Sequence, residues 1–488
     1  MTRINVSPYA DALWKGVGGH FDSFSEIIYE FIDNIISNYD KNKSMIRAAI
    51  INIEPVNTTN TIRVKIEDCG SGIENIEAAL RLGDTSNRQT PLNEHGFGFK
   101  HALASANPEN NRWIIYTRTE ADLSNGQYKV VKAPYDFSIE EEIVSITTSP
   151  WPGRLNGSGT MFEFECSREL FNTLIQDRRG NPGVHKCLEL LSWDLGYVYS
   201  NIIKEGRIAL TILSSTVNYN SPVAAITPDW VGLYDPKEGK IKKSLDGNDV
   251  DIEFKFGEIK ANDISSRHYQ RNMSTSGLEV RINGRLLESN LLTDVWGVEQ
   301  HNKYNHFLAQ VNIISNNPDY LPKTRTSKNG IRIGDKKLLD LFRWVKSVMP
   351  EPPEKLSKEF SERELVKKLK EEKERHTRAV DKHIDNEFEV FRIRQTPVRV
   401  DLYVYDGTEV VLYEAKKGSA DMKAFYQLLM YWDGAVDDEI EPSEGVLLAE
   451  SFADGVVNLI EDFNNKTDAK GNRYKFVCKT WTEEGINF

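Results

Sequence analysis

The chain has 488 residues, of which 39% are hydrophobic and 27% charged, and its formal net charge is −12. This length predicts two to four domains, and the composition excludes an intrinsically disordered protein. No run of about eighteen apolar residues occurs and the start MTRINVSPYADALW resembles no secretory signal, so we expect neither a membrane span nor export.

The first expected element is a buried helix over residues 23–40, SFSEIIYEFIDNIISNYD. Its apolar side chains surround most of the helix, which is typical of a helix covered on nearly all sides. Glu30, Asp33 and Asn34 nevertheless share one stripe, because residues three and four apart lie on the same helix face. Buried polar groups are costly unless they are paired or hold an ion. The pattern therefore indicates either a polar network between helices or an ion site.

Three glycine-containing motifs follow in the chain: DCGSG at 68–72, GFGFK at 96–100 and GSGT at 157–160. The first comes after an expected strand at 62–66, and its glycines let the backbone approach a ligand closely. An aspartate at the end of a strand can accept a hydrogen bond from an exocyclic amine. The second precedes an expected helix at 101–104, and a glycine-rich loop before a helix N-terminus is suited to binding an anion. The third precedes an expected strand at 161–164.

In this order, ExxxN, DxGxG, GxGxK and GT resemble the four motifs of the GHKL superfamily, which includes gyrase, heat-shock chaperone ATPases, histidine kinases and MutL. The resemblance implies a Bergerat fold, an α/β sandwich that binds ATP and Mg²⁺, with an ATP lid at residues 80–95. It implies that Glu30 polarises the attacking water and that Asn34 binds Mg²⁺. Helical spacing puts Asp33 beside them, so we expect it among the nucleotide-binding residues. Carried over in the same way, the remaining nucleotide-binding residues are Asp68 for the adenine amine, Gly70 and Gly72 for the base pocket, Gly96, Gly98 and Lys100 for the phosphates, and Thr160 as the support of Asp68.

Residues 176–348 are expected to begin with a helix at 184–204 and to continue with strands such as 207–213 and 278–282. Within the superfamily the chain is most similar to MutL and the microrchidia ATPases, so this region resembles an S5-type transducer domain. The resemblance implies that a lysine of the loop at 321–330 reaches the γ-phosphate, with Lys328 as the first candidate and Lys323 as the second.

A proline-rich break, MPEPP at 349–353, is expected to end the transducer region, since proline cannot continue a helix. The stretch at 354–381 is rich in Glu, Lys and Arg and has few apolar positions. We expect it to be a solvated helical spacer or a short coiled coil. The four cysteines, Cys69, Cys166, Cys187 and Cys478, form no CxxC pair, which favours free thiols in a reducing cytoplasm.

The last region combines two expected strands, 398–404 and 410–416, joined by an Asp-Gly hairpin turn. Glu414 and Lys416 share one face of the second strand, and the hairpin brings Asp401 near them. Two carboxylates can hold Mg²⁺, which prefers oxygen ligands, and a neighbouring lysine can stabilise charge that develops on a phosphate. The alternative is a cross-strand salt bridge on a solvated face.

An expected helix at 424–431 carries Gln427 and Tyr431 on one face. Asp401, the ExK pair and this QxxxY resemble the PD-(D/E)xK nucleases, particularly the RecB-like branch. The resemblance implies a restriction-endonuclease-like α/β domain with Asp401, Glu414, Lys416 and Gln427 as catalytic residues. It also implies metal binding by Asp401 and Glu414, supplemented by an acid from an upstream helix, for which Glu387 is the candidate and Glu389 the alternate.

Together these patterns predict an α+β multidomain protein divided into an ATPase domain at 1–175, a transducer domain at 176–348, the break and spacer at 349–382, and a nuclease-like domain at 383–488. The expected function is ATP-dependent DNA processing in the cytoplasm. ATP would close two chains into a homodimer on duplex DNA, as in prokaryotic restriction or antiviral defence. The net charge of −12 means that DNA contacts must come from local basic patches. A DNA clamp that does not cut and a chaperone-like remodeller are the alternatives.

Overall fold

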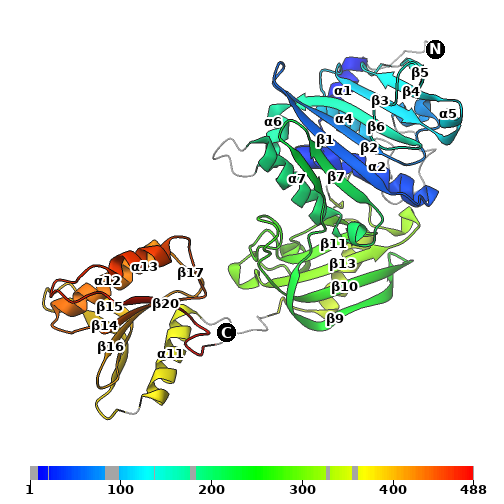
Figure 1. Ribbon diagram of the computed structural model, residues 1–488. Coiled ribbons are helices and arrows are strands. Elements are labelled where there is room, and N and C mark those ends of the chain that lie inside the picture. Colours follow the sequence, from blue (N-terminus) through cyan, green and yellow to red (C-terminus); the bar gives the residue numbers. More distant parts are fainter. Residues whose placement is uncertain are drawn as a thin grey trace. The chain divides into compact units, whose positions relative to one another are not determined.

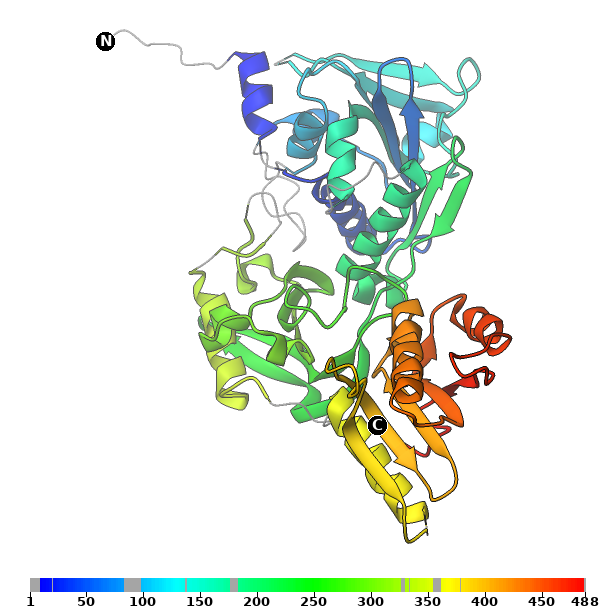
Figure 2. The ribbon, with the colours of Figure 1, turned by 90° about the vertical axis from the view of Figure 1, so that its left-hand side faces the viewer.

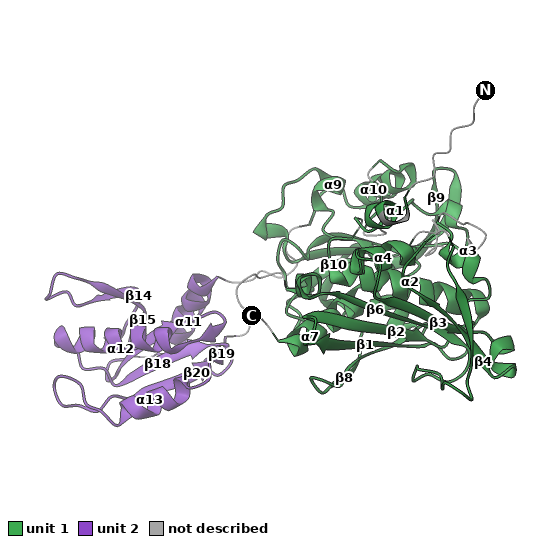
Figure 3. Ribbon diagram, turned by 90° about the horizontal axis from the view of Figure 1, so that it is seen from above, with its two compact units in different colours: residues 1–356 green, residues 357–488 purple. Residues whose placement is uncertain are grey.

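The computed structural model describes residues 9–19, 21–82, 98–136, 138–175, 183–325, 330–332, 334–353, 361–377 and 379–486. The chain forms two compact units, residues 1–356 and residues 357–488, which Figure 3 shows in different colours. The chain contains helices and several mixed sheets, and these elements enclose separate apolar cores. The protein is therefore an α+β protein of several domains. Within these described ranges, no helix is long and apolar enough to cross a membrane.

The first unit begins with an eight-stranded sheet of order β5-β4-β3-β6-β2-β1-β7-β8 (Figure 1). Its strands are β1 Ala48–Val56, β2 Thr61–Asp68, β3 Trp113–Arg118, β4 Gln127–Lys132, β5 Glu141–Ser145, β6 Gly159–Ser167, β7 Ala209–Ser214 and β8 Tyr219–Pro222. Neighbouring strands are antiparallel, except that β1 and β7 are parallel. Fully buried residues alternate with half-buried ones along β1 and β2, as in a sheet with one face on the core.

Helices supply the other side of this core. They are α1 Ala10–Val17, α2 Phe24–Asn42, α3 Ile76–Leu80, α4 Gly98–Ala106, α5 Glu120–Ser124, α6 Arg168–Phe171, α7 Val184–Val198 and α8 Ser200–Lys204, with a 3₁₀ turn at Asn172–Leu174. The side chain of Ser23 caps α2 by accepting a hydrogen bond from the Glu26 N–H. α2 contacts both α4 and α7, and its side chains are buried nearly all round. The helix that carries the polar stripe therefore lies inside the domain.

A second sheet of order β12-β11-β13-β10-β9 completes the first unit. Its elements are β9 Asp229–Leu245, β10 Asn248–Lys260, β11 Gly277–Ile282, β12 Arg285–Glu288 and β13 Phe307–Ile314, with α9 Leu292–Trp296, α10 Lys336–Val348 and 3₁₀ turns at Asn302–Tyr304 and Pro318–Tyr320. The central strand β13 is parallel to β11 and antiparallel to β10. Trp344 of α10 packs against Phe254 and Phe256, which joins this helix to the sheet.

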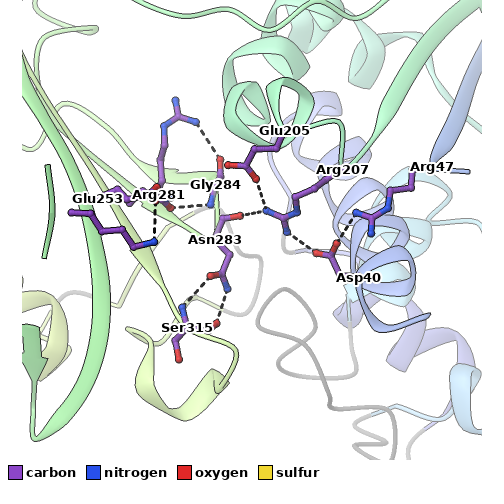
Figure 4. A network of polar contacts seen from close by, with 11 residues as sticks. Asp40, Arg47, Glu205, Arg207, Glu253, Arg281, Asn283, Gly284 and Ser315 are labelled. Atoms are coloured by element: carbon purple, nitrogen blue, oxygen red, sulfur yellow. Dashed lines mark hydrogen bonds and ion pairs between the residues drawn. The ribbon is translucent and has the colours of Figure 1, made fainter. Parts of the chain in front are cut away.

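The border between the two sheets differs from the expected boundary at residues 175 and 176. The strand predicted at 207–213 belongs to the first sheet, because β7 pairs with β1 and β8 pairs with β7. The first sheet therefore extends to Pro222. Arg207 then links the sheets, since its Nη2 donates to Asp40 at 2.6 Å and its Nη1 donates to the Asn283 carbonyl at 2.8 Å (Figure 4).

The second unit has a five-stranded sheet of order β14-β15-β16-β18-β20 and a small two-stranded sheet of β17 and β19. Its elements are α11 Glu362–His376, β14 His383–Val390, β15 Val398–Tyr405, β16 Val410–Ala415, β17 Ser419–Ala420, α12 Met422–Asp437, β18 Glu444–Ala449, β19 Ser451–Phe452, α13 Val456–Asn464 and β20 Phe476–Thr480. The first three strands are antiparallel and the last three are parallel. Two separate cores lie on the two faces of the sheet.

Helix α11 differs from the solvated spacer that the charge pattern predicted. Leu365, Val366 and Leu369 are buried against Leu402 and Tyr413 of the sheet. Figure 1 and Figure 2 both show α11 on one side of this sheet and α12 and α13 on the other. The few apolar positions are sufficient because they lie on one stripe of the helix. Residues 361–377 thus belong to the second unit rather than to a connector.

Candidate functional site

A cavity of about 590 Å³ lies in the first unit beside α2 and the end of β2. Its volume is within the range of about 300–1,000 Å³ that is usual for small-molecule sites. The polar residues that line it include Asn34, Asn38, Asp68, Ser71, Asn75, Thr119, Glu120 and Thr160. Three of the sequence motifs, at 34, at 68–72 and at 160, therefore meet at one cavity.

Asn34 and Glu30 lie one turn apart on α2. Asn34 lines the cavity, and its Nδ2 donates to the Glu30 carbonyl at 2.7 Å. Glu30 is only 1% exposed. A Cβ atom added to Gly98 would overlap the Glu30 carboxylate, so the absence of a side chain at Gly98 lets α4 begin against α2. Residues of two different motifs, Glu30 and Gly98, are thus in contact.

Asp33 departs from the expectation that it belongs to the nucleotide site, because it does not line the cavity. Its Oδ1 accepts hydrogen bonds from Arg285 Nε at 2.7 Å and from the Tyr199 hydroxyl at 2.8 Å. Arg285 begins β12 in the second sheet. Asp33 and Asn34 point in different directions from α2, because successive residues of a helix are about 100° apart around its axis. The geometry assigns Asp33 to an ion pair between helix α2 and strand β12 of the second sheet.

Asp68 lies at the end of β2 and lines the cavity. Burial raises the pKa of its carboxyl to about 7, although hydrogen bonds from the backbone of Gly70 and Thr160 act in the opposite direction. The Gly70 N–H donates to Oδ1 at 2.7 Å. The carboxyl group of Asp68 is therefore a hydrogen-bond acceptor that the backbone fixes in place at the wall of the cavity. It is suited to an N–H donor such as an amino group on a purine.

The two glycines after Asp68 are required by close approaches. Gly72 has φ +74°, and a Cβ there would overlap the Arg118 carbonyl. A Cβ at Gly70 would overlap the side-chain amide of Asn38. A side chain at Gly72 would displace the Arg118 backbone, and one at Gly70 would displace the Asn38 side chain. The loop thus follows the cavity wall with its backbone exposed to a ligand.

Two functional candidates were missed by the sequence analysis. Asn38 lines the cavity, accepts from the Ser71 N–H at 3.0 Å and donates to Ser71 Oγ at 2.8 Å, which ties the glycine loop to α2. Its position four residues after Asn34 was the available signal. Thr117 accepts from the Ile73 N–H at 2.7 Å, and its Oγ1 lies 3.0 Å from Oγ1 of Thr160. No local motif marks Thr117.

Lys100 also departs from its expected place. It is 3% exposed, and its Nζ donates to the carbonyls of Ala79 at 2.8 Å and Arg81 at 3.0 Å rather than lining the cavity. It therefore fastens the end of α3 in this conformation. Gly96 and Lys328 lie outside the described residues, as do residues 83–95 of the expected lid. Lys323, the second candidate for the γ-phosphate, is described and exposed.

The second candidate site lies in the second unit, on β15 and β16. Leu402 pairs with Tyr413, and the same register continued by one residue sets Asp401 opposite Glu414. Asp401 Oδ2 accepts from the Ala415 N–H at 2.9 Å, and Lys416 Nζ lies 2.6 Å from Glu414 Oε1. The hairpin predicted from sequence therefore brings Asp401, Glu414 and Lys416 together.

The electrostatics of this cluster favour a bound cation. Burial and then the neighbouring charge of Asp401 raise the pKa of Glu414 to about 7, and Lys416 and Tyr431 act against that shift. The pKa of Asp401 is also raised, mainly by burial. Two adjacent carboxylates that are hard to ionise together fit a divalent metal ion, whose charge would offset their repulsion. Asp401 and Glu414 are the residues that would hold Mg²⁺.

An acid that the sequence analysis did not select completes the cluster. Glu362 begins α11, accepts from the Lys417 N–H at 3.1 Å and lies 3.7 Å from Lys416 Nζ. It lines a cavity of about 590 Å³ together with Asp401. The capping box formed by Ser361 and Glu364 fixes the start of α11, and its S-x-x-E spacing was the only sequence signal of this helix start.

Glu387 and Glu389, the two acids expected to supplement the metal site, have arginines as partners instead. Glu387 lies 3.2 Å from Arg363 and 3.4 Å from Arg399, and Glu389 lies 3.5 Å from Arg399. Among the residues that the structure describes, no group of three His, Cys, Asp or Glu side chains is gathered closely enough to hold a metal ion. Glu387 thus lies on strand β14 rather than on a helix and is an ion-pair partner of two arginines.

Tyr431 lies near enough to the cluster for its hydroxyl and the Glu414 carboxylate to shift each other's pKa, whereas Gln427 is half-buried one turn earlier on α12. Burial and then the Glu414 carboxylate raise the pKa of the Tyr431 hydroxyl, so it stays protonated and can donate to Glu414. The QxxxY spacing thus places at least its tyrosine at the site.

No known protein-family profile matches the chain, and no curated protein sequence matches it. Among solved structures, the B subunit of DNA gyrase from Myxococcus xanthus is similar at 11% identity and a TM-score of 0.38, covering 69% of this chain and 93% of the gyrase chain. The N-terminal domain of a DNA repair protein is similar at 14% identity and a TM-score of 0.39, covering 70% of this chain and 97% of that domain. At these values neither similarity identifies a family or a function.

Proposed function

We propose that this chain is an ATPase whose nucleotide state controls a metal-dependent nuclease acting on DNA. The observation that carries the proposal is the presence in one chain of two separate polar sites, the cavity beside Asn34 and Asp68 and the cluster of Asp401, Glu414 and Lys416. The first has the size and the acceptor for a purine nucleotide. The second has the two carboxylates and the lysine that metal-assisted phosphodiester hydrolysis needs.

At the nucleotide site, Asp68 would accept the adenine amino group and the backbone of the glycine loop would lie along the base. Asn34 would offer its amide oxygen to Mg²⁺, which neutralises phosphate charge when bound. Glu30, one turn from Asn34 and against Gly98, would orient and deprotonate the attacking water. Lys328 or Lys323 would complete the site from the transducer loop.

At the nuclease site, Lys416 would stabilise negative charge on the scissile phosphate, since its ammonium group lies between Glu414 and Glu362. Tyr431 would orient Glu414 through its hydroxyl, and Gln427 would approach the same strand of DNA from α12. Glu362 takes the place first expected for Glu387 as the helical acid of the site.

Regulation would come from assembly. ATP would close two chains into a homodimer around duplex DNA, and two nuclease sites would then cut both strands, as suits restriction or antiviral defence in the cytoplasm of a prokaryote. Light scattering with a non-hydrolysable ATP analogue tests the assembly step. An unchanged mass with saturating analogue would contradict it.

The function is tested by measuring ATP turnover and cleavage of supercoiled plasmid on the same wild-type preparation, with and without ATP and with Mg²⁺ or EDTA. We expect Mg²⁺-dependent nicking or linearisation whose rate changes with ATP. Absence of ATP turnover would remove the ATPase, and absence of cleavage under every nucleotide condition would remove the nuclease.

A clamp that holds DNA without cutting it is the second candidate. A clamp would retain circular plasmid in the presence of ATP and release it after linearisation by an added enzyme. Nuclease activity that disappears with Glu414→Gln would exclude this alternative.

A further inference from the structure

Three cations line the cavity that contains Asp401. Arg363 and Lys367 are four residues apart on α11 and so share one helix face, and Arg399 precedes Asp401 by two residues on β15 and so shares its strand face. All three line the cavity together with Glu362 and Asp401. Exposed cations therefore line a cavity that two acids, Glu362 and Asp401, also line.

One carboxylate, that of Glu387, contacts both arginines, and Arg399 also lies 3.5 Å from Glu389. Glu387 lies 3.2 Å from Arg363 and 3.4 Å from Arg399, so it bridges a helix and a strand on either side of the cavity. Arg363 is 90% exposed and Arg399 is 64% exposed in their side chains, so neither contributes to a core. Exposed ion pairs contribute little to stability, so stability alone does not account for this arrangement.

The backbone at Glu387 is unusual for a strand. Its φ is +60°, in the left-handed region that residues with a side chain rarely adopt. The flanking pairs Asn386 with Leu402 and Phe388 with Val400 set Glu387 opposite Asp401, although it is not one of the regular pairs of β14 and β15. Such a conformation recurs where function determines the placement of a side chain. Here it places a carboxylate between two arginines beside the carboxylates of the candidate nuclease site.

We propose that Arg363 and Arg399 form a clamp for the phosphodiester backbone of the nucleic acid, and that Glu387 occupies this clamp until a substrate phosphate displaces it. Arginine binds carboxylate and phosphate oxygens with the same fork of N–H donors, so one anion can replace the other. Lys367 adds a third positive charge one turn along α11. The part of the cavity that the two acids line then receives the phosphate to be cut, while the clamp holds the neighbouring backbone. This inference rests on the proposed nuclease function and names the part of its substrate that the site recognises.

The clamp is tested by binding rather than by cleavage. The full chain is titrated into a short fluorescently labelled DNA duplex in EDTA, where no metal-dependent cutting occurs, and anisotropy is followed at several salt concentrations. Arg363→Ala and Arg399→Ala should each weaken binding, and each should reduce the slope of log K against log salt by about 0.9, the value for one lost contact with a duplex phosphate. Glu387→Gln should tighten binding at low salt, because it removes the competing anion without removing a cation.

Arg375→Ala is the matched control, since Arg375 is also an exposed arginine of α11 with a glutamate partner, Glu372, but does not line the cavity. It should leave the affinity and the salt slope unchanged. If all three arginine variants lost the same amount of DNA affinity, binding would depend on general charge attraction and not on the clamp, and the proposal would be overturned. Wild-type affinity in both Arg363→Ala and Arg399→Ala would also overturn it.

Cleavage assays on the same proteins separate this proposal from the proposed function. If the wild type cuts plasmid and the two arginine variants bind and cut as well as it does, the nuclease stands and the clamp fails. If the arginine variants lose binding but the wild type never cuts, the clamp stands and the nuclease fails. Unchanged thermal unfolding of each variant shows that a loss of binding is not a loss of fold.

Discussion

The Asp33 carboxylate and the Arg285 guanidinium form a fully buried ion pair, with 2.7 Å between Oδ1 and Nε, that joins α2 of the first sheet domain to β12 of the second. Tyr199 donates to the same Asp33 oxygen. Because α2 also carries Glu30 and Asn34, this pair fixes the helix of the proposed nucleotide site to the second sheet. A change of nucleotide state that moves α2 would therefore act directly on β12.

Removing one member of this pair should be strongly destabilising. Asp33→Ala leaves a buried arginine without its main counter-charge, and breaking a buried pair in this way costs about 3–5 kcal/mol. Urea unfolding monitored by tryptophan fluorescence measures the loss. Arg343→Ala, which breaks an exposed pair with Asp340, is the control and should leave the midpoint unchanged. If the double variant Asp33→Asn with Arg285→Met is no more stable than Asp33→Ala, the cost does not arise from an uncompensated charge.

Gly98→Ala should reproduce the loss of Glu30. Glu30→Ala should lower ATP turnover by about 10²–10⁴, the usual value for a general base, while nucleotide still binds. A methyl group at Gly98 would need the space of the Glu30 carboxylate, so it should displace that group and lower turnover as well. Steady-state hydrolysis and a fluorescent-nucleotide titration provide both readouts. Gly16→Ala is the control, since nothing lies within 4 Å of a Cβ there. Normal turnover in Glu30→Ala would remove Glu30 from the mechanism.

Asn34→Ala should act on binding rather than on turnover. Asn34 lines the cavity, and its side chain also fastens to the Glu30 carbonyl. Without the amide oxygen, Mg²⁺ should no longer strengthen nucleotide binding, although binding without metal should persist. Titrations of ATP with Mg²⁺ and with EDTA test this difference. A Mg²⁺ effect as large as in the wild type would contradict the assignment of Asn34.

Binding of adenosine should depend on pH through Asp68. Burial raises the pKa of this carboxyl to about 7 from its ordinary value of 3.8. Between pH 3.8 and about pH 7, the carboxyl is therefore protonated in the folded protein and ionised in the unfolded chain. Stability from this group therefore decreases as the pH rises through about 7. The ionised carboxylate is the stronger acceptor for the adenine amino group, so affinity should increase from about pH 6 to about pH 8.

Adenosine is the appropriate ligand for this test because it has no phosphate that titrates in the same range. Competition against a fluorescent nucleotide gives the affinity at each pH. Asp68→Asn should bind more weakly and should lose the pH dependence. An Asp68→Asn variant that keeps the pH profile of the wild type would show that another group titrates.

The sequence allowed contacts to be predicted when the residues lie close together along the chain or belong to a known motif, but not when they lie far apart. Asp401, Glu414 and Lys416 lie on one hairpin, so alternation along two strands was sufficient to predict that they meet. Asn34 and Asp68 were found from motifs, and the structure places both at one cavity. Helical periodicity alone placed Asp33 beside Asn34, but its partner Arg285 is 252 residues away and no local pattern reveals it.

The same limit explains the errors in the second unit. Glu362 was passed over because α11 was interpreted as a solvated spacer from its charge, whereas Leu365 and Leu369 pack it onto the sheet. Glu387 was selected as an acid on an upstream helix, but it lies on strand β14, and its φ of +60° and its two arginine partners depend on tertiary structure. The domain boundary expected at residues 175 and 176 was wrong for the same reason. The parallel pairing of β7 with β1 joins segments that are distant in the sequence, and no local pattern predicts it.

DNA cleavage should require Asp401, Glu414 and Lys416 but not the ATP cavity residues. Asp401→Ala and Glu414→Gln each remove a carboxylate that would hold Mg²⁺. Lys416→Ala removes the ammonium group that lies 2.6 Å from Glu414. Loss of such a cation at a preorganised site lowers the rate by about 10²–10³. All three proteins should hydrolyse ATP at the wild-type rate, since the cluster is built within the second unit. Plasmid nicking and ATP turnover are measured on the same preparations, and Lys423→Ala and Glu461→Gln, exposed residues of α12 and α13, serve as charge-matched controls. Cutting by all three variants at the wild-type rate would place the nuclease elsewhere or in a contaminant. Loss of cutting in the two controls as well would show that the charge of the domain surface, rather than the cluster, determines activity.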